Sequence, residues 1–269
     1  MFLRTLSRGA AAALLFSAVP IAAPAAAAGP AASMAIPADF GSPVYPKRGR
    51  YLLVDAAAAK LFMVEDGQVV DTMKVIVGKP DAQTPTISSK IYYATLNPYW
   101  NVPADLARTI IAPRVLDKGV GYLTQNGYQV LASFDEGAPE ISPRSVDWKA
   151  VAAGRETVKI RQLPGPANSM GQVKFGFPNG FGIFLHDTPK KELFASDSRA
   201  VSNGCVRLED APRLARWLLG REPESVAAGI PEQHVALPRA VPIYITYLNA
   251  APAELALAPS ASFASPLAR

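Results

Sequence analysis

The stretches IFLHDTP at residues 183–189 and VSNGCVRL at residues 201–208 contain the two rarest reactive side chains of this chain. Cys205 is the only cysteine among 269 residues, and His186 is one of two histidines. A thiolate can attack a carbonyl carbon while an imidazole takes and returns the proton, and covalent acyl transfer uses this pair. A free cysteine is often only a small core residue. The nearby imidazole favours a nucleophilic role for Cys205.

Strand signals precede and include His186. Residues 171–177 and 181–185 are rich in apolar and aromatic side chains, and the segment PNG at 178–180 predicts a hairpin loop between two strands. His186 then stands at the end of the second strand. Residues 190–201 predict a loop with one turn of helix.

A helix and a last strand are predicted after the cysteine. Asp210 is a suitable N-cap and Gly220 a suitable C-cap for a helix over residues 211–219. Residues 235–248 contain a β-branched and aromatic run that predicts the final strand of the domain.

The N-terminal part of the domain predicts a β-meander. Residues 51–54, 60–64 and 69–78 have strand composition, and Asp66-Gly67 is a strong signal for a two-residue hairpin turn. Residues 86–96 predict a further strand.

The pattern changes at residue 97. Residues 97–103, NPYWNVP, form an aromatic and proline-punctuated turn, and residues 105–116 have apolar side chains near helical spacing. Asn126-Gly127 predicts a turn, and residues 147–153 a short helix. We interpret residues 97–165 as an insertion within one domain, because no linker-like segment bounds them.

Both ends of the chain predict segments outside the folded domain. Residues 1–28 contain Arg4 and Arg8, a short apolar run and a small-residue cleavage site, which is typical of a signal peptide. Residues 29–48 predict a flexible leader, and residues 249–269 a disordered tail rich in alanine and proline. We therefore expect an exported protein with no stable membrane span after cleavage.

Composition excludes several classes of protein. The formal net charge is +5, and it becomes +3 without Arg4 and Arg8 of the signal segment. Basic residues are scattered, so nucleic acid is not an expected partner. A single cysteine excludes an internal disulfide. No ligand cluster is present, so neither a metal nor an organic cofactor is expected.

The two motifs around His186 resemble a known signature. The pattern His-x-Thr at 186–188 and Ser-x-Gly-Cys-Val-Arg at 202–207 resembles that of the L,D-transpeptidase catalytic domain, also called the YkuD-type domain. The segment at 97–103 resembles the large-capping-loop branch of this family, which is mostly found in Gram-negative envelopes. The resemblance covers about residues 50–248. Asn203 departs from it, because many members have histidine there.

The resemblance implies a fold and an activity. The fold is mostly β with few helices, a sandwich-like catalytic domain at 49–248 whose capping insertion, at about 97–165, mixes helix and loop. The activity is peptidoglycan 3-3 cross-linking in the periplasm through a thioester on Cys205, with carbapenems as expected inhibitors. The implied partners are peptidoglycan stem peptides, and other wall-synthesis proteins are candidate partners. Many members also carry a wall-binding domain, so the targeting of this chain stays open.

The resemblance also assigns roles to residues. Cys205 is the expected nucleophile and His186 the general base and then acid, and the backbone N–H groups of Gly204 and Cys205 are candidate oxyanion donors. The main-chain carbonyl of Asp187 is expected to orient His186, with the Asp187 carboxylate as rival. The expected substrate-binding residues are Arg207, Ser202, Asn203, Thr188, Trp100 and Tyr99. An ion pair with Glu209 is an equal alternative for Arg207. Packing of the insertion against the core is the preferred interpretation of Tyr99 and Trp100, and the hydroxyls of Thr188 and Ser202 are also suited to holding the two loops together. His234 is assigned to the surface.

The same residues serve related reactions. Water as acceptor gives an L,D-carboxypeptidase or endopeptidase, and a protein lysine as acceptor gives an enzyme that anchors proteins to peptidoglycan. A non-catalytic wall-binding domain with a relic thiol is a further alternative, which the intact His186 and Cys205 disfavour.

Overall fold

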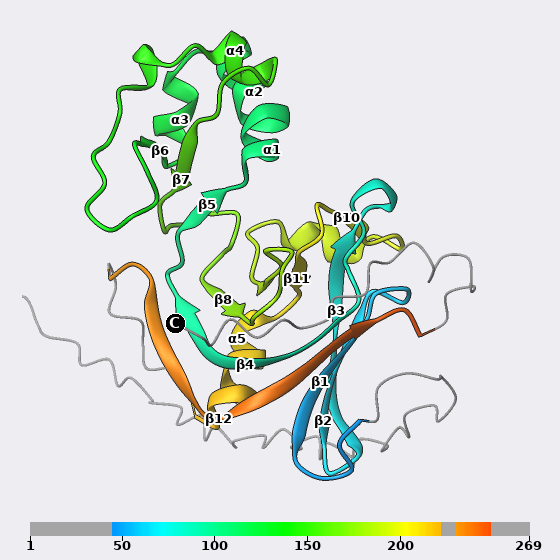
Figure 1. Ribbon diagram of the computed structural model, residues 1–269. Coiled ribbons are helices and arrows are strands. Elements are labelled where there is room, and N and C mark those ends of the chain that lie inside the picture. The colour runs from blue at the N-terminus through cyan, green and yellow to red at the C-terminus, as the bar shows by residue number, and fades with distance from the viewer. Residues whose placement is uncertain (1–44, 222–229, 249–269) are drawn as a thin grey trace, which may run out of the picture. The chain divides into compact units, whose positions relative to one another are not determined.

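Figure 1 shows the computed structural model, which describes residues 45–221 and 230–248 of the chain. The predicted signal peptide, the leader up to residue 44 and the predicted tail lie outside the described residues. Strands account for most of the regular structure and the helices are short, so the expected mostly β fold class is confirmed. In the two described ranges, no helix has the length and apolar content to cross a membrane.

Nine strands of the described residues form one sheet. They are β1 (Arg50–Asp55), β2 (Lys60–Glu65), β3 (Gln68–Gly78), β4 (Ile87–Leu96), β8 (Val173–Gly176), β9 (Leu185–His186), β10 (Ala200–Ser202), β11 (Val206–Leu208) and β12 (Gln233–Thr246). Their spatial order is β10-β3-β11-β9-β8-β4-β12-β1-β2, and β2 also pairs with β3. The sheet therefore closes on itself around one hydrophobic core, as expected for a sandwich-like domain.

Strand β3 closes the sheet because it is long enough to serve two sets of partners. Its first part pairs antiparallel with β2 as far as Lys74, and its last part pairs with β11 and β10. The turn from β2 to β3 has φ values of 49° at Asp66 and 78° at Gly67. Positive φ at both central residues is the type I′ geometry that matches strand twist, so the predicted hairpin is confirmed.

Helix α5 (Ala211–Leu219) fills part of the enclosed core. Its buried face includes Leu214 and Leu218, which belong to the same cluster as the inward side chains of the strands. Asp210 accepts a hydrogen bond from the Arg213 backbone at 3.0 Å, and Gly220 is left-handed with φ 70°. Both predicted caps are therefore confirmed. Because α5 follows β11 directly, its packing also fixes the strand that continues from Cys205.

Between β4 and β8 the chain forms a separate small unit with its own core. Its elements are β5 (Trp100–Val102), α1 (Ala104–Leu106), η2 (Ala107–Ile111), α2 (Ala112–Lys118), α3 (Gly121–Gln125), β6 (Tyr128–Leu131), η3 (Pro143–Ser145), α4 (Trp148–Ala152) and β7 (Lys159–Gln162). A three-stranded sheet in the order β5-β7-β6 packs with the helices. The helical pattern at 105–116 and the short helix at 147–153 are thus confirmed.

Two local predictions are wrong, and the first is the strand predicted for residues 181–185. Residues 181–184 are not a strand, and β9 contains only Leu185 and His186. The cause is Asn179, whose side chain bonds the backbone of Phe177, Phe181 and Ile183 and so holds a wide loop instead of a hairpin.

The second wrong prediction concerns the end of the leader, which the sequence analysis placed at residues 29–48. The described structure already begins at residue 45. Tyr45, inside the predicted flexible leader, stacks on Tyr51 with ring centroids 5.7 Å apart. It also contacts the edge of Tyr244 at 5.0 Å. These aromatic contacts fix the end of the leader to the outer face of β1 and β12.

Candidate active site

The two motifs meet because their strands are neighbours. β9 and β11 pair in parallel, with His186 opposite Arg207. Cys205 directly precedes β11, and Gly204 before it has φ 112°, a backbone conformation that L side chains rarely adopt. The sharp approach to β11 places the thiol beside the end of β9. The structure thus brings Cys205 and His186 to one place, as the sequence predicted.

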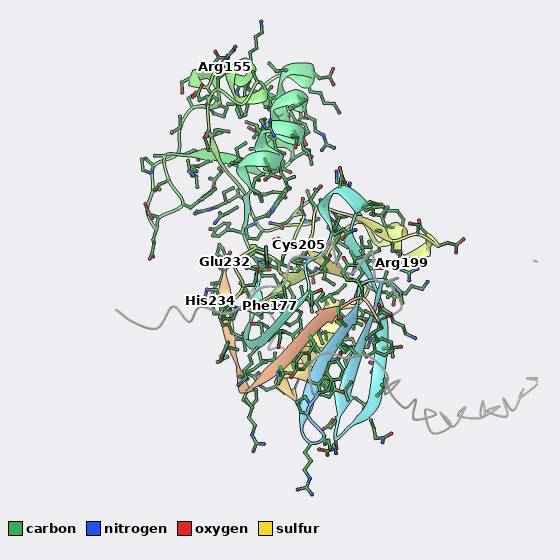
Figure 2. The ribbon with its side chains drawn as sticks, turned by 45° about the vertical axis from the view of Figure 1, so that its right-hand side comes forward. Arg155, Phe177, Arg199, Cys205, Glu232 and His234 are labelled. Atoms are coloured by element: carbon green, nitrogen blue, oxygen red, sulfur yellow. The ribbon has the colours of Figure 1, made fainter. Side chains whose placement is uncertain are left out.

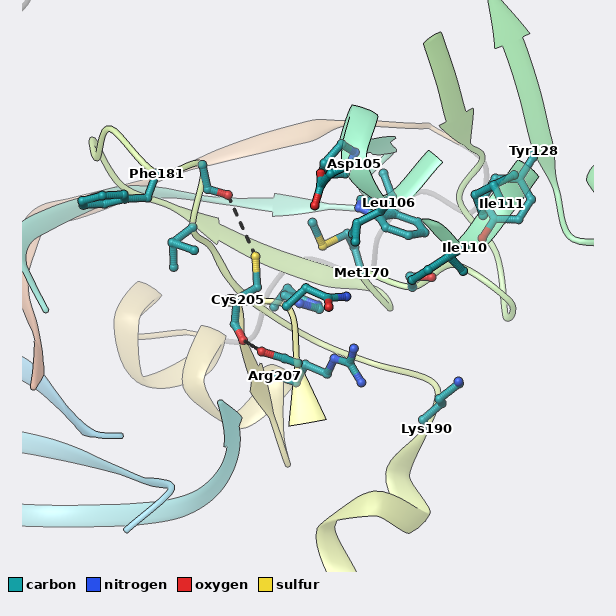
Figure 3. Close-up of a pocket in the computed structure, with 18 of the residues that line it drawn as sticks. Asp105, Leu106, Ile110, Ile111, Tyr128, Met170, Phe181, Lys190, Cys205 and Arg207 are labelled. Carbon is teal, nitrogen blue, oxygen red and sulfur yellow. Dashed lines mark hydrogen bonds between the residues drawn. The ribbon is translucent and has the colours of Figure 1, made fainter. Parts of the chain in front are cut away.

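A cavity of about 340 Å³ opens at this place (Figure 3). One wall comes from the main sheet and its loops, with Phe181, Gly182, Ile183, His186, Lys190, Ser202, Asn203, Cys205 and Arg207. The other comes from the insertion and its return segment, with Trp100, Pro103, Asp105, Leu106, Ile110, Ile111, Arg114, Tyr128, Ser169 and Met170. The insertion therefore contributes directly to the site.

His186 is held as a neutral base. Its side chain is only 5% exposed, and Nδ1 lies 2.5 Å from the Asp187 carbonyl oxygen. A carbonyl oxygen only accepts, so Nδ1 carries the proton and Nε2 is left to act as a base. Burial, helped by the positive charge of Arg207, lowers the pKa of His186 to about 4. The main-chain carbonyl of Asp187 thus has the orienting position that the sequence analysis gave it.

Cys205 is held as a neutral thiol. Burial raises the pKa of Cys205, and the Phe184 backbone and the Arg207 charge oppose that rise only in part. Its Sγ lies 3.9 Å from the Gly182 carbonyl oxygen, to which the thiol donates (Figure 3). A protonated thiol and an unprotonated imidazole therefore form the resting pair, and the thiol hydrogen must turn away from Gly182 before His186 can take it.

The Asp187 carboxylate connects parts of the site instead of touching the imidazole. Oδ2 accepts from the Gln172 backbone at 3.0 Å, and Oδ1 lies 2.7 Å from Lys191 Nζ. Gln172 in turn accepts from the Asn97 backbone at 2.9 Å, where the insertion begins. A Cβ at Gly171 would lie 2.4 Å from the same carboxylate, so only glycine fits there. The two ends of the insertion are thereby tied to the residue that orients His186.

Ser202 and Thr84 hold the turn that carries the thiol. Ser202 Oγ donates to the Cys205 carbonyl at 2.6 Å and accepts from Gly204 N–H at 3.1 Å. Thr84 Oγ1 donates to the Gly204 carbonyl at 2.8 Å. The Gly204 N–H therefore bonds to Ser202 in this structure, and its expected role as an oxyanion donor stays a prediction.

Arg207 is a cation without a carboxylate partner among the described residues. Glu209, the alternative partner, instead accepts from the Lys74 backbone at 3.2 Å. Arg207 lines the cavity (Figure 3), so substrate binding is the reading that its position favours.

The other expected binding residues divide into two groups. Asn203 and Trp100 line the cavity, and Trp100 also packs on the core of the insertion. Thr188 is buried, and its hydroxyl accepts from the Lys190 backbone at 3.2 Å. Tyr99 lies beneath the Arg161 guanidinium, 4.7 Å from ring centroid to Cζ, and neither it nor Thr188 belongs to the lining. The packing alternative thus describes Tyr99.

His234 lies apart from this site. It stands exposed on β12, away from Cys205 (Figure 2), and its Nδ1 is 3.0 Å from Thr95 Oγ1. Its expected surface position agrees with the structure. Across the described residues, no group of three or more His, Cys, Asp or Glu side chains is placed to hold a metal ion.

The low pKa of His186 predicts acid-sensitive stability. The unfolded chain binds a proton near pH 6.5, whereas the folded protein resists it until about pH 4. The unfolded state therefore holds more protons in this window, and the free energy of unfolding should fall by about 3 kcal/mol as pH drops through it. Denaturant titrations between pH 7 and pH 4 measure this loss. His186→Ala should flatten the slope and His234→Ala should not. Equal slopes in wild type and His186→Ala would contradict the assignment.

A thiol and a neutral imidazole that share one cavity are the two groups that covalent acyl transfer through a cysteine requires. The family model of the L,D-transpeptidase catalytic domain, YkuD, matches residues 49–239, which is most of the chain. The chain therefore belongs to the L,D-transpeptidase catalytic domain family, which confirms the resemblance at the level of the family.

The individual proteins that match this chain have low to moderate sequence identity to it. A Haemophilus influenzae protein named "Putative L,D-transpeptidase" is 33% identical over 168 residues, which are 62% of this chain and 33% of that protein. The chain thus spans about a third of the length of this curated relative. An L,D-transpeptidase structure from Mycobacterium smegmatis is 16% identical with a TM-score of 0.34, over 73% of this chain and 58% of that one. One from Stackebrandtia nassauensis is 15% identical with a TM-score of 0.33, over 77% and 60%.

Proposed function

We propose that the protein is a peptidoglycan L,D-transpeptidase that forms 3-3 cross-links through a thioester on Cys205. The observation that carries this proposal is the pairing of Cys205 with a neutral, oriented His186 at one cavity. The family supplies the substrate class, which is the peptide stem of peptidoglycan.

In the first step, His186 Nε2 takes the thiol proton as the sulfur attacks the carbonyl carbon of the third stem residue. A C–S bond forms and the C–N bond to the terminal D-alanine breaks. The imidazolium returns the proton to the departing amine, so the enzyme keeps only the acyl group. The backbone N–H groups of Gly204 and Cys205 are the candidate donors for the oxyanion, and the Gly204 N–H would have to release Ser202 to take that role.

In the second step, a side-chain amine of a neighbouring stem attacks the thioester. A C–N bond forms, the C–S bond breaks, and His186 carries the proton from the amine to the sulfur. Substrate carboxylates suit the cationic side of the cavity, where Arg207 and Lys190 line the wall. The apolar side chains of the insertion limit the access of water to the thioester, which favours transfer over hydrolysis.

The proposed site of action is the periplasm. Support comes from the signal-like residues 1–28 of the sequence and from the wall chemistry of the family. Cleavage of that segment is part of the proposal.

The direct test is incubation of the purified protein with disaccharide tetrapeptides, followed by mass analysis of the products. Cross-linked dimers that lack one D-alanine support transpeptidation. Stems that are merely shortened would support the carboxypeptidase alternative, and unchanged substrate would contradict an enzymatic role. Cys205→Ala is the control for contaminating activities.

A carbapenem should acylate Cys205 and remain attached. The thiolate opens the strained lactam ring as it would attack the peptide, and the insertion walls shield the resulting thioester from water. Intact-mass spectrometry should show one carbapenem adduct per chain, formed more readily than the adducts of most penicillins. Peptide-active protein that forms no carbapenem adduct would count against this reading of the site.

A further inference from the structure

The charges of the cavity are distributed unevenly. Its cationic side chains are Arg114, Lys190 and Arg207, and His186 is neutral. Asp105 is the one carboxylate among the described residues that line it. Asp105 belongs to the insertion, whereas Arg207 and Lys190 belong to the wall formed by the main sheet and its loops. A bound molecule therefore meets two cations on the sheet side, and on the insertion side it meets Arg114 and the single carboxylate of the lining, Asp105.

The structure gives the Asp105 carboxylate no partner of its own among the described residues. It stands in the first turn of α1, yet it makes no capping bond, in contrast to Asp147 and Asp210, which cap their helices. Arg108 lies one turn further along, but no ion pair joins the two residues. The backbone carbonyl oxygen of Asp105 accepts a hydrogen bond from Thr109 Oγ1 at 2.7 Å, which leaves the carboxylate itself uninvolved.

The location of the Asp105 side chain matters as much as its lack of a bonding partner among the described residues. Figure 3 shows Asp105 on the insertion side of the cavity whose lining also includes Met170 and Cys205. Leu106 and Trp100 provide apolar surface within the same lining. Asp105 is an exposed residue of this lining, so an ammonium group can reach its carboxylate directly from solvent.

We propose that Asp105 recognises the amino group of the acceptor, and that it makes the site selective for amine acceptors over water. The inference rests on the proposed transpeptidation and identifies the residue that decides between transfer and hydrolysis. The acceptor is thereby assigned to primary amines that are cationic in solution, whereas the donor carboxylates bind at the cationic wall.

Asp105 acts by positioning and takes no part in bond making. It holds the ammonium form beside the thioester, and the amine loses one proton to solvent before it attacks. A C–N bond then forms, the C–S bond breaks, and His186 transfers the second proton from the amine nitrogen to the Cys205 sulfur. Water carries no such charge, so Asp105 gives it no comparable advantage.

The test measures how the thioester partitions. Wild type and Asp105→Asn are supplied with a donor tetrapeptide and increasing concentrations of an amine acceptor stem, and the ratio of dimer to shortened stem is determined. This ratio is independent of how fast the thioester forms. We expect it to fall about tenfold in Asp105→Asn, which corresponds to about 1.4 kcal/mol of lost acceptor binding. Asp105→Glu should recover part of the loss.

Asp117→Asn is the matched control, because Asp117 is exposed on α2 of the same insertion and does not line the cavity. It should keep the wild-type ratio. A ratio in Asp105→Asn equal to that of Asp117→Asn would overturn the inference and leave the transpeptidase intact. Wild-type protein that forms no dimers at any acceptor concentration would instead contradict the proposed function itself.

Discussion

Cys205→Ser should retain the fold and lose essentially all acyl transfer. A serine hydroxyl is far less readily ionised than a thiol, and the neutral His186 of this site is too weak a base to compensate. Wild-type protein mixed with donor peptide should gain the mass of the acyl group, and Cys205→Ser should gain none. The expected loss of rate exceeds a thousandfold, larger than for any other substitution considered.

The loss of activity in Cys205→Ser can be attributed to the nucleophile only if the variant still folds. Cys205 is partly buried and packs at the edge of the main core, and serine is its closest isostere. The unfolding midpoint of Cys205→Ser should therefore stay near that of wild type. An active Cys205→Ser enzyme, or an adduct on another residue of the folded variant, would contradict the nucleophile assignment.

Local signals in the sequence predicted the elements whose geometry depends only on their own residues. Asp66-Gly67 fixes a hairpin because two residues alone set its geometry, and Asp210 with Gly220 fixes α5 in the same way. Elements that depend on distant partners were missed. β10 and β11 are three residues long each and exist because β3 pairs with them.

The site shows the same division. His186 and Cys205 could be found because both are rare in this chain and lie in one recognisable segment. Thr84 could not be found from spacing, because it contacts Gly204 across 120 residues and a lone threonine has no signature. Lys191 was missed for a similar reason, since its role emerges only with the buried Asp187 carboxylate. The direction of the Gly204 N–H depends on a turn geometry that residue types alone do not determine.

His186→Ala should lower the rate of thioester formation at least about a hundredfold at pH 7, the usual size of general acid–base assistance. The physical reason is the resting state of the pair. Burial keeps the thiol protonated, so nearly every turnover needs the imidazole to remove that proton. The rate is measured by the appearance of the acyl-enzyme mass in single-turnover reactions. His234→Ala, the other histidine of the chain, should react like wild type.

The pH profile distinguishes a lost base from a disturbed fold. In wild type the neutral imidazole is the active form, so the rate should stay level through mildly acidic pH and fall only as pH approaches the His186 pKa of about 4. Without the imidazole, attack depends on the small fraction of thiolate, which increases tenfold per pH unit below the pKa of the thiol. The rate of His186→Ala should therefore rise steeply with pH and approach wild type in alkali. A variant whose deficit stays constant from pH 6 to pH 9 would show that His186 acts through structure, and the base would have to be sought elsewhere.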